Sequence, residues 1–126
     1  MSKKKILIIE DDPAIVDSIA ALLKTDYDVD SAKNGNEGLE KVASFKPELI
    51  ILDLLMPEKD GFDVCKRLKT DEALKNIPVI ALSSFTELYG MSFSGEDTKG
   101  MLPSDIYLSK PLDPKTLLRE IKDHIG

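Results

Sequence analysis

Five short runs rich in apolar residues recur along the 126-residue chain, and segments with helical periodicity alternate with them. The runs span residues 5–10, 27–32, 48–53, 78–83 and 105–109. Runs of this length, bounded by turn residues, predict strands. Strands that alternate with helices run parallel, because a parallel pair needs a long crossover connection. The sequence therefore predicts an α/β fold with a doubly wound parallel sheet and helices on both faces.

Four segments carry apolar side chains at helical spacing. Pro13 opens the first of them, because proline suits the first turn of a helix. Asn34-Gly35 predicts a turn before the second segment. Asp113 and Pro114 are typical of a helix start and precede the last segment. The apolar stripes consist of Ile15, Ile19, Leu22 and Leu23; Leu39, Val42 and Ala43; Phe62, Cys65 and Leu68; and Leu117, Leu118, Ile121 and Ile125.

Composition and charge narrow the possible classes of protein. A chain of this length forms about one domain, so we expect residues 1–126 to be a single domain without an output domain. The net charge of −6 argues against nucleic-acid binding, which usually needs a basic surface. Cys65 is the only cysteine, which excludes an internal disulfide and indicates a cytoplasmic protein. No apolar run approaches the ~20 residues of a membrane span.

Polar side chains follow the apolar runs at the point where each predicted strand ends. In an open parallel sheet these ends share one edge, where ligands bind. A lone buried carboxylate such as Asp53 is costly, and two carboxylates ~4 Å apart repel by about 4 kcal/mol at an effective dielectric of 20. A hard divalent cation such as Mg²⁺ would remove that cost, and Asp53 could then attack an incoming phosphoryl group. The residues at these strand ends are Glu10, Asp11, Asp12, Asp53, Ser83 and Lys110.

This arrangement resembles the receiver domain of two-component response regulators over nearly the whole chain. The resemblance implies a five-stranded parallel sheet of order 2-1-3-4-5 with helices on both faces. It also implies that a histidine kinase or a phosphotransfer protein phosphorylates the domain, which then binds a downstream protein. The segments that carry the resemblance are "ILIIEDDP", "LIILDLLMPEKDGFDVCKRLK", "IPVIALSS" and "YLSKPL".

The resemblance assigns the acidic residues to phosphorylation and metal binding. Asp53 is the implied phosphoacceptor. Glu10 and Asp11 are the implied pair that binds Mg²⁺ or Mn²⁺, directly or through water, and the main-chain carbonyl of Leu55 completes the protein ligands. Asp12 has two interpretations, either a flanking ligand or the cap of the helix that begins at the next residue.

The same resemblance assigns roles to residues of the later strands and loops. Ser83 is the hydroxyl that moves to a phosphoryl oxygen, Lys110 pairs with the phosphoryl group, and Tyr107 is the aromatic switch residue. The side chains of Leu55 and Phe85 flank the phosphoryl group. Both are apolar and neither can orient a water, so we expect slow hydrolysis of the phosphorylated protein.

Residues 85–104 depart from the family pattern. Receivers normally have a regular fourth helix here, but Gly90, Gly95 and Gly100 would each cost a helix about 1 kcal/mol relative to alanine. We therefore expect an atypical fourth-helix region, with a short helical piece near 86–91 followed by an irregular segment. Such a segment could be a slack insertion or could become ordered against a partner.

The expected function is that of a stand-alone receiver, a monomer or weak dimer that assists its own phosphorylation and is not an enzyme acting on other substrates. The main alternative is a pseudo-receiver, a binding module that works without phosphorylation. A phosphatase of the haloacid-dehalogenase type would place a second aspartate two residues after Asp53, where this chain has Leu55. A flavodoxin-like flavin site would need a first loop that attracts phosphate, and the loop here is acidic.

Overall fold

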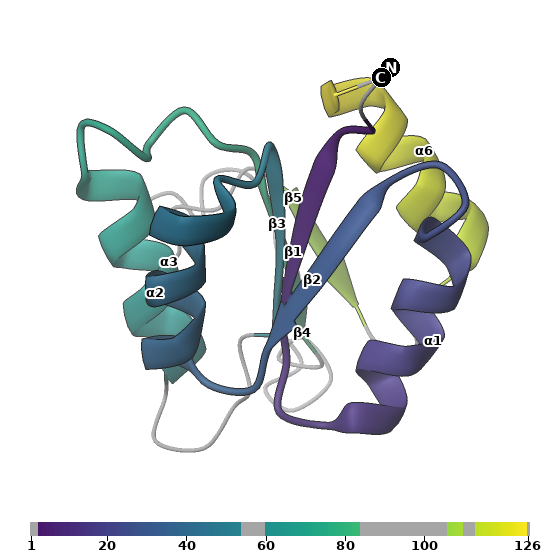
Figure 1. The fold of residues 1–126 in the computed structure, drawn as a ribbon, viewed down its shortest axis with the longest axis horizontal. Helices are drawn as coiled ribbons and strands as arrows, with labels where there is room; N and C mark the ends of the chain where they lie inside the picture. The colour runs from purple at the N-terminus through teal and green to yellow at the C-terminus, as the bar shows by residue number, and fades with distance from the viewer. Residues whose placement is uncertain (1–2, 54–59, 84–105, 110–112, 126) are drawn as a thin grey trace.

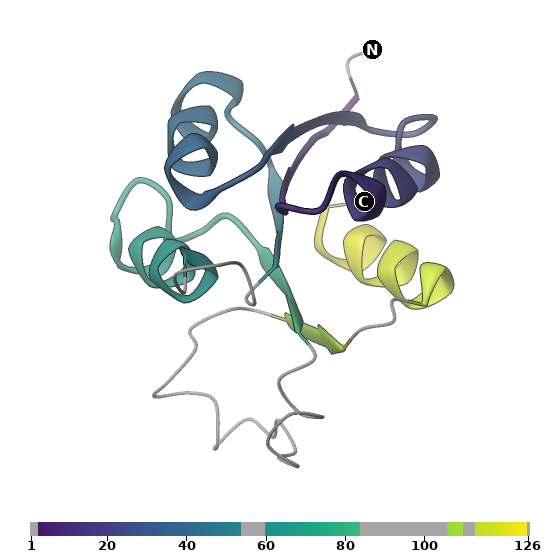
Figure 2. The same ribbon diagram turned by 90° about the horizontal axis from the view of Figure 1, so that it is seen from below.

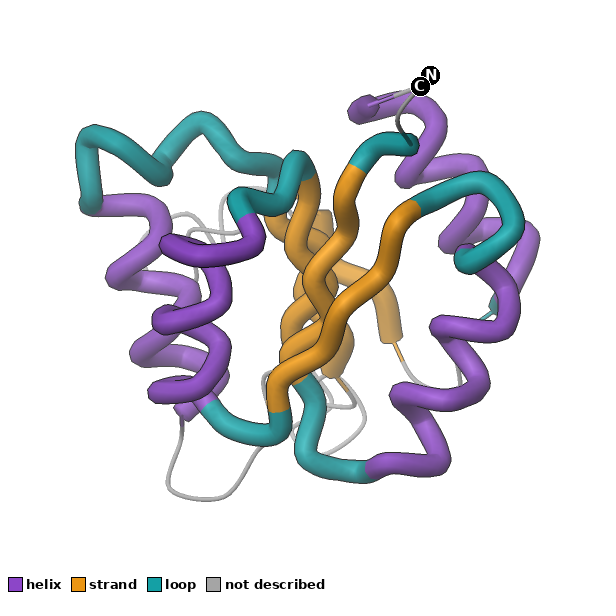
Figure 3. The backbone as a smooth tube through the Cα atoms, in the orientation of Figure 1, coloured by secondary structure: helices purple, strands orange, loops and turns teal. Residues whose placement is uncertain are grey.

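A parallel sheet lies between two layers of helices in the computed structural model, which describes residues 3–53, 60–83, 106–109 and 113–125 (Figure 1). The five strands have the order β2-β1-β3-β4-β5, and every neighbouring pair is parallel. Figure 3 shows them as the central layer. The predicted α/β class with a parallel sheet is confirmed. The strands are β1 Lys5–Ile9, β2 Asp28–Ala32, β3 Leu49–Asp53, β4 Val79–Ser83 and β5 Ile106–Ser109.

Helices cover both faces of this sheet. Helices α1 and α6 lie on one face, and α2 and α3 lie on the other, as the view from below shows most clearly (Figure 2). No helix in the described ranges is long and apolar enough to cross a membrane. The expected irregular segment at 85–104 lies outside the described residues. The helices are α1 Pro13–Leu23, α2 Gly35–Phe45, α3 Asp60–Thr70 and α6 Pro114–Ile125.

Two helix starts are defined by short polar side chains. Asp12 caps α1, where its carboxylate accepts a hydrogen bond from the Ala14 N–H at 2.9 Å. Asn34 caps α2, where its side-chain oxygen accepts from the Glu37 N–H at 2.8 Å. The turn predicted at Asn34-Gly35 is the N-cap of α2, which begins directly at Gly35. Asparagine is preferred in both turns and helix caps.

Residues from each predicted helical stripe are buried against the sheet, with one correction; the side chain of Phe62 lies outside the described part of the structure. Leu117 and Ile121 of α6, Ile19 and Leu23 of α1, and Cys65 of α3 are buried. Ala43, predicted to belong to the stripe of α2, is exposed, and Phe45 packs against the core from that helix instead. Alanine has little apolar surface to bury, so its position at the edge of the stripe costs little.

Helix α2 lies close to strand β1, the neighbour of the edge strand β2. A Cβ atom added to Gly38 would lie 2.6 Å from Cδ1 of Ile9 and 3.0 Å from its Cγ1. Ile9 is fully buried, so it has little room to move away. Glycine is therefore required at position 38 for this approach, and α2 rests directly above the last residue of β1.

Candidate functional site

The carboxyl ends of β1 and β3 bring acidic side chains together at one edge of the sheet. Ile9 pairs with Leu52 in the parallel register, so Glu10 and Asp53, the next residue in each segment, lie side by side. Asp11 follows in the loop that leads to α1. One carboxylate oxygen from each of Glu10, Asp11 and Asp53 lies within 4.8 Å of the other two. The structure thus brings together three of the predicted site residues.

These three side chains differ in their exposure to solvent. Glu10 and Asp53 are each 2% exposed, whereas Asp11 is exposed. Two unit charges 4–5 Å apart repel by about 3–4 kcal/mol at an effective dielectric of 20. Because hard divalent cations prefer carboxylate oxygens, and Asp11 leaves one side of the group open, the residues present fit Mg²⁺ or Mn²⁺. Within the part of the chain that the structure describes, this is the one such group.

Asp12 does not belong to this acidic group. Its carboxylate accepts from the Ala14 N–H, and its main-chain carbonyl accepts from the N–H groups of Ile15 and Val16, each at 3.1 Å. The bonds from Ala14 and Ile15 satisfy main-chain donors that the first turn of a helix otherwise leaves without a partner, and the bond from Val16 is the first regular bond of the helix. Of the two interpretations of Asp12, the structure supports the helix cap.

The main chain of Glu10 is held by the neighbouring strand β2. Its N–H donates to the carbonyl of Ala32 at 2.9 Å, one step beyond the last pair of the β1–β2 register. The preceding side chain, Ile9, lies beneath α2 at Gly38. The position of Glu10 therefore depends on β2 and α2, although neither element contributes a carboxylate to the acidic group.

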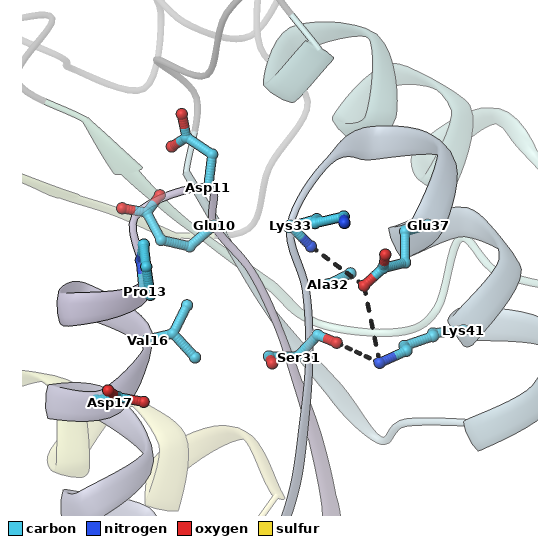
Figure 4. A pocket seen from close by; sticks show the side chains of 10 residues that line it. All are labelled: Glu10, Asp11, Pro13, Val16, Asp17, Ser31, Ala32, Lys33, Glu37 and Lys41. Atoms are coloured by element: carbon cyan, nitrogen blue, oxygen red, sulfur yellow. Dashed lines mark hydrogen bonds and ion pairs between the residues drawn. The ribbon is translucent and has the colours of Figure 1, made fainter.

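A pocket of about 430 Å³ opens beside the acidic group, between the start of α1, the end of β2 and the first half of α2 (Figure 4). Glu10 and Asp11 form one side of the pocket, and Lys33 and Lys41 form the other. The sequence reasoning missed both lysines. The available signal for Lys41 was its position four residues after Glu37 on a predicted helix, a spacing at which opposite charges interact. That pair is present, with 3.8 Å between the Lys41 Nζ and the Glu37 carboxylate.

The other predicted site residues lie partly outside the described ranges. Ser83 is the last residue of β4, and its neighbour Leu82 pairs with Asp53 of β3. Tyr107 lies in β5, paired with Ala81. Leu55, Phe85 and Lys110 are outside the described residues. The strand positions of Ser83 and Tyr107 are therefore set by the sheet.

Comparisons with known proteins point to one family. The family model for the response regulator receiver domain matches residues 6–122. The DNA-binding dual master transcriptional regulator RpaA of Synechocystis is 39% identical over 94% of this chain and 47% of its own length. Protein PilG of Pseudomonas aeruginosa is 37% identical over 96% of this chain and 87% of its own. The chain thus spans about half the length of RpaA and most of PilG.

Solved structures share the fold. The chemotaxis response regulator CheY4 of Vibrio cholerae superposes with a TM-score of 0.81, at 25% identity, over 98% of this chain and 100% of its own.

Proposed function

Because the chain belongs to the response regulator receiver domain family, we propose that Asp53 accepts a phosphoryl group and that this phosphorylation switches the binding of a partner protein. The observation that carries the proposal is the close approach of Glu10 and Asp11 to Asp53, within 4.8 Å, at the carboxyl edge of the sheet. The proposed phosphodonor is a histidine kinase or a phosphotransfer protein. The domain assists its own phosphorylation and is not an enzyme acting on other substrates.

Glu10, Asp11 and Asp53 would hold Mg²⁺ or Mn²⁺, directly or through water, together with the main-chain carbonyl of Leu55, which lies outside the described residues. When bound, such a cation neutralises the carboxylates and attracts phosphoryl oxygens. The support for this role is the donor set, in which three carboxylates offer oxygen ligands from two adjacent strand ends.

Asp53 would act as the nucleophile in an in-line transfer. An oxygen of its carboxylate attacks the phosphorus of the phosphohistidine while the P–N bond breaks, and the electron pair of that bond remains on the imidazole nitrogen. The register of β3 fixes Asp53 in place, and its burial limits the access of water. The contribution of the chain is therefore mainly positioning.

The proposed response involves the later strands. Ser83 moves to a phosphoryl oxygen, Lys110 pairs with the phosphoryl group, and Tyr107 moves inward, which shifts a two-state equilibrium that exists before phosphorylation. Leu55 and Phe85 would slow hydrolysis. We propose that the domain works in the cytoplasm, as a monomer or weak dimer, and that a downstream protein binds its phosphorylated state.

Incubation with Mg²⁺ and acetyl phosphate, followed by mass measurement, tests the phosphoacceptor. The expected product is a single phosphate adduct that is stable in acid and labile in base, and Asp53→Asn should give none. An unmodified wild-type protein would favour the pseudo-receiver. Repeated turnover of phosphate monoesters would favour a phosphatase.

A pair of aspartate variants tests the metal site. We expect Mg²⁺ to raise the melting temperature of the wild type, equivalent to about 2.7 kcal/mol at one hundred times its dissociation constant. Asp11→Ala should abolish this shift without lowering the stability of the metal-free protein, because it removes a repelling charge. Asp12→Ala is the matched control, which should lose helix capping but keep the Mg²⁺ response. An unchanged Mg²⁺ response in Asp11→Ala would disprove the assignment.

A further inference from the structure

An ion pair covers the outer side of the edge strand β2 next to the acidic group. The Lys41 ammonium lies 3.1 Å from the Asp30 carboxylate and donates to the main-chain carbonyl of Ser31. The same Asp30 oxygen accepts the Ser31 N–H at 2.8 Å. Figure 4 shows Lys41 reaching from α2 to Ser31. Both main-chain groups of Ser31 therefore have partners, although none of the described strands lies on that side of β2.

The next residue of β2 holds Glu10. Successive carbonyls of a strand point to opposite sides, so Ala32 faces β1 where Ser31 faces outward. The Ala32 carbonyl accepts the Glu10 N–H at 2.9 Å. Lys41 thus fixes the end of β2 from one side while that end fixes the main chain of Glu10 on the other.

We propose that Lys41 is a positioning residue for the acidic group, which sets the affinity for Mg²⁺ by holding the end of β2 and, through it, Glu10. Lys41 lines the same pocket as Glu10. It is not a metal ligand itself, because the possible ligands among the described residues are the carboxylates of Glu10, Asp11 and Asp53. The inference rests on the proposed function for the identity of the cation. The positioning of Glu10 by Lys41 does not require that the cation is bound.

Charge and positioning predict opposite effects when this lysine is removed. A positive charge beside the acidic group repels a divalent cation, so by charge alone its loss would strengthen Mg²⁺ binding. Loss of a residue that orients a metal ligand weakens binding, typically by tenfold or more. The direction of the change therefore separates the two roles.

Lys33 provides a matched control at the same pocket. Among the described residues, the hydrogen bond that Lys33 makes to Glu37, 3.3 Å long, is donated by its main-chain N–H and survives substitution of the side chain. Lys33→Met and Lys41→Met each remove one positive charge from the pocket lining, but only Lys41→Met removes contacts to β2. Lys41→Arg retains both the charge and the donors.

The experiment measures Mg²⁺ binding by calorimetry and hydrogen exchange of the Glu10 amide in the metal-free protein. We expect Lys41→Met to weaken Mg²⁺ binding about tenfold and to speed exchange at Glu10 without affecting amides in the centre of β3. Lys33→Met should bind Mg²⁺ as tightly as the wild type or up to about twofold more tightly, and Lys41→Arg should restore most of the affinity.

Lys41→Met binding Mg²⁺ as tightly as the wild type would overturn the inference, as would unchanged exchange at Glu10. Weakened binding with a uniform rise in exchange across all strands would also overturn it, because the effect would then be global destabilisation. If the wild type binds no Mg²⁺, the proposed metal site fails, and exchange at Glu10 alone decides whether Lys41 positions this residue.

Discussion

The two faces of the sheet are packed with side chains of different size. On the α1/α6 face, every buried residue that the structure describes is leucine or isoleucine except Tyr27. The α2/α3 face includes two alanines, three valines and a cysteine among its buried residues, and Gly38 adds a contact with no side chain at all. Small residues allow helices to approach a sheet closely, whereas large ones hold the helices away and fill the space.

The two faces should therefore respond differently to substitutions that change the volume of a side chain. A face filled by large side chains should suffer most from lost volume, because a cavity remains. A closely packed face should suffer most from added volume, because buried neighbours cannot move. The close face is also the one whose helix α2 reaches the end of β2 and the residue before Glu10, so its packing bears directly on the acidic group.

The largest expected effect is loss of volume on the α1/α6 face. Leu117 of α6 is fully buried, and Leu117→Ala should lower the free energy of unfolding by about 2–5 kcal/mol in urea titrations. Exposed Arg119 on the same helix is the control. Arg119→Ala should change the free energy of unfolding by less than about 0.5 kcal/mol. Equal effects of the two substitutions would contradict the packing described for this face.

Added volume on the α2/α3 face should have the next largest effect. Gly38→Ala should lower the free energy of unfolding by about 1–3 kcal/mol, because the new methyl group meets Ile9. Ile9→Val removes the Cδ1 atom involved, so the double variant should be more stable than the sum of the single effects predicts. Strict additivity in this double-mutant cycle would show that the two residues do not crowd each other.

Helix caps should matter equally on the two faces. Asp12→Ala acts on α1 and Asn34→Ala on α2, and each should lower the free energy of unfolding by about 1 kcal/mol. The comparison is made without Mg²⁺, so that only the caps are measured. A much larger loss for Asn34→Ala would mean that the start of α2 also supports the close packing behind it.

The smallest expected effect is at the ends of the same helices. Lys46, which ends α2, has a φ of 56°, and Lys46→Gly should raise the free energy of unfolding by about 0.5 kcal/mol. Lys24, which ends α1, has a φ of −61°, so Lys24→Gly should give no gain. Thermal unfolding of the two variants side by side checks both, and a gain for Lys24→Gly alone would reverse the expectation.

The strands and helices were predictable because their periodicity reflects burial. The apolar run before Asp53 and the stripe around Leu117 both identify residues that the structure buries. The closeness of Glu10, Asp11 and Asp53 followed from the rule that parallel strands end at one edge. The sequence did not show whether Asn34 belongs to a turn or caps a helix, because asparagine is common at both positions.

The role of Lys41 was beyond a linear reading of the sequence. Its partners Asp30 and Ser31 lie 11 and 10 residues earlier in the chain, respectively, and they meet it only because α2 folds back along the edge of the sheet. A lysine on a predicted helix is usually a solvated surface residue. Predicting the contact of Lys41 with β2 would require two facts that the sequence does not give: that β2 is an edge strand, and that the main-chain groups of Ser31 face outward.

Cys65, the only cysteine of the chain, is fully buried on the α2/α3 face. Its thiol can react with a bulky reagent only when α3 moves away from the sheet, so the labelling rate measures how often this layer opens. No cysteine lies in α1 or α6, and the signal is therefore specific to one side of the molecule. The labelling rate of Cys65 therefore reports the opening of the α2/α3 layer, which includes the helix next to Glu10. No cysteine has to be introduced for this measurement.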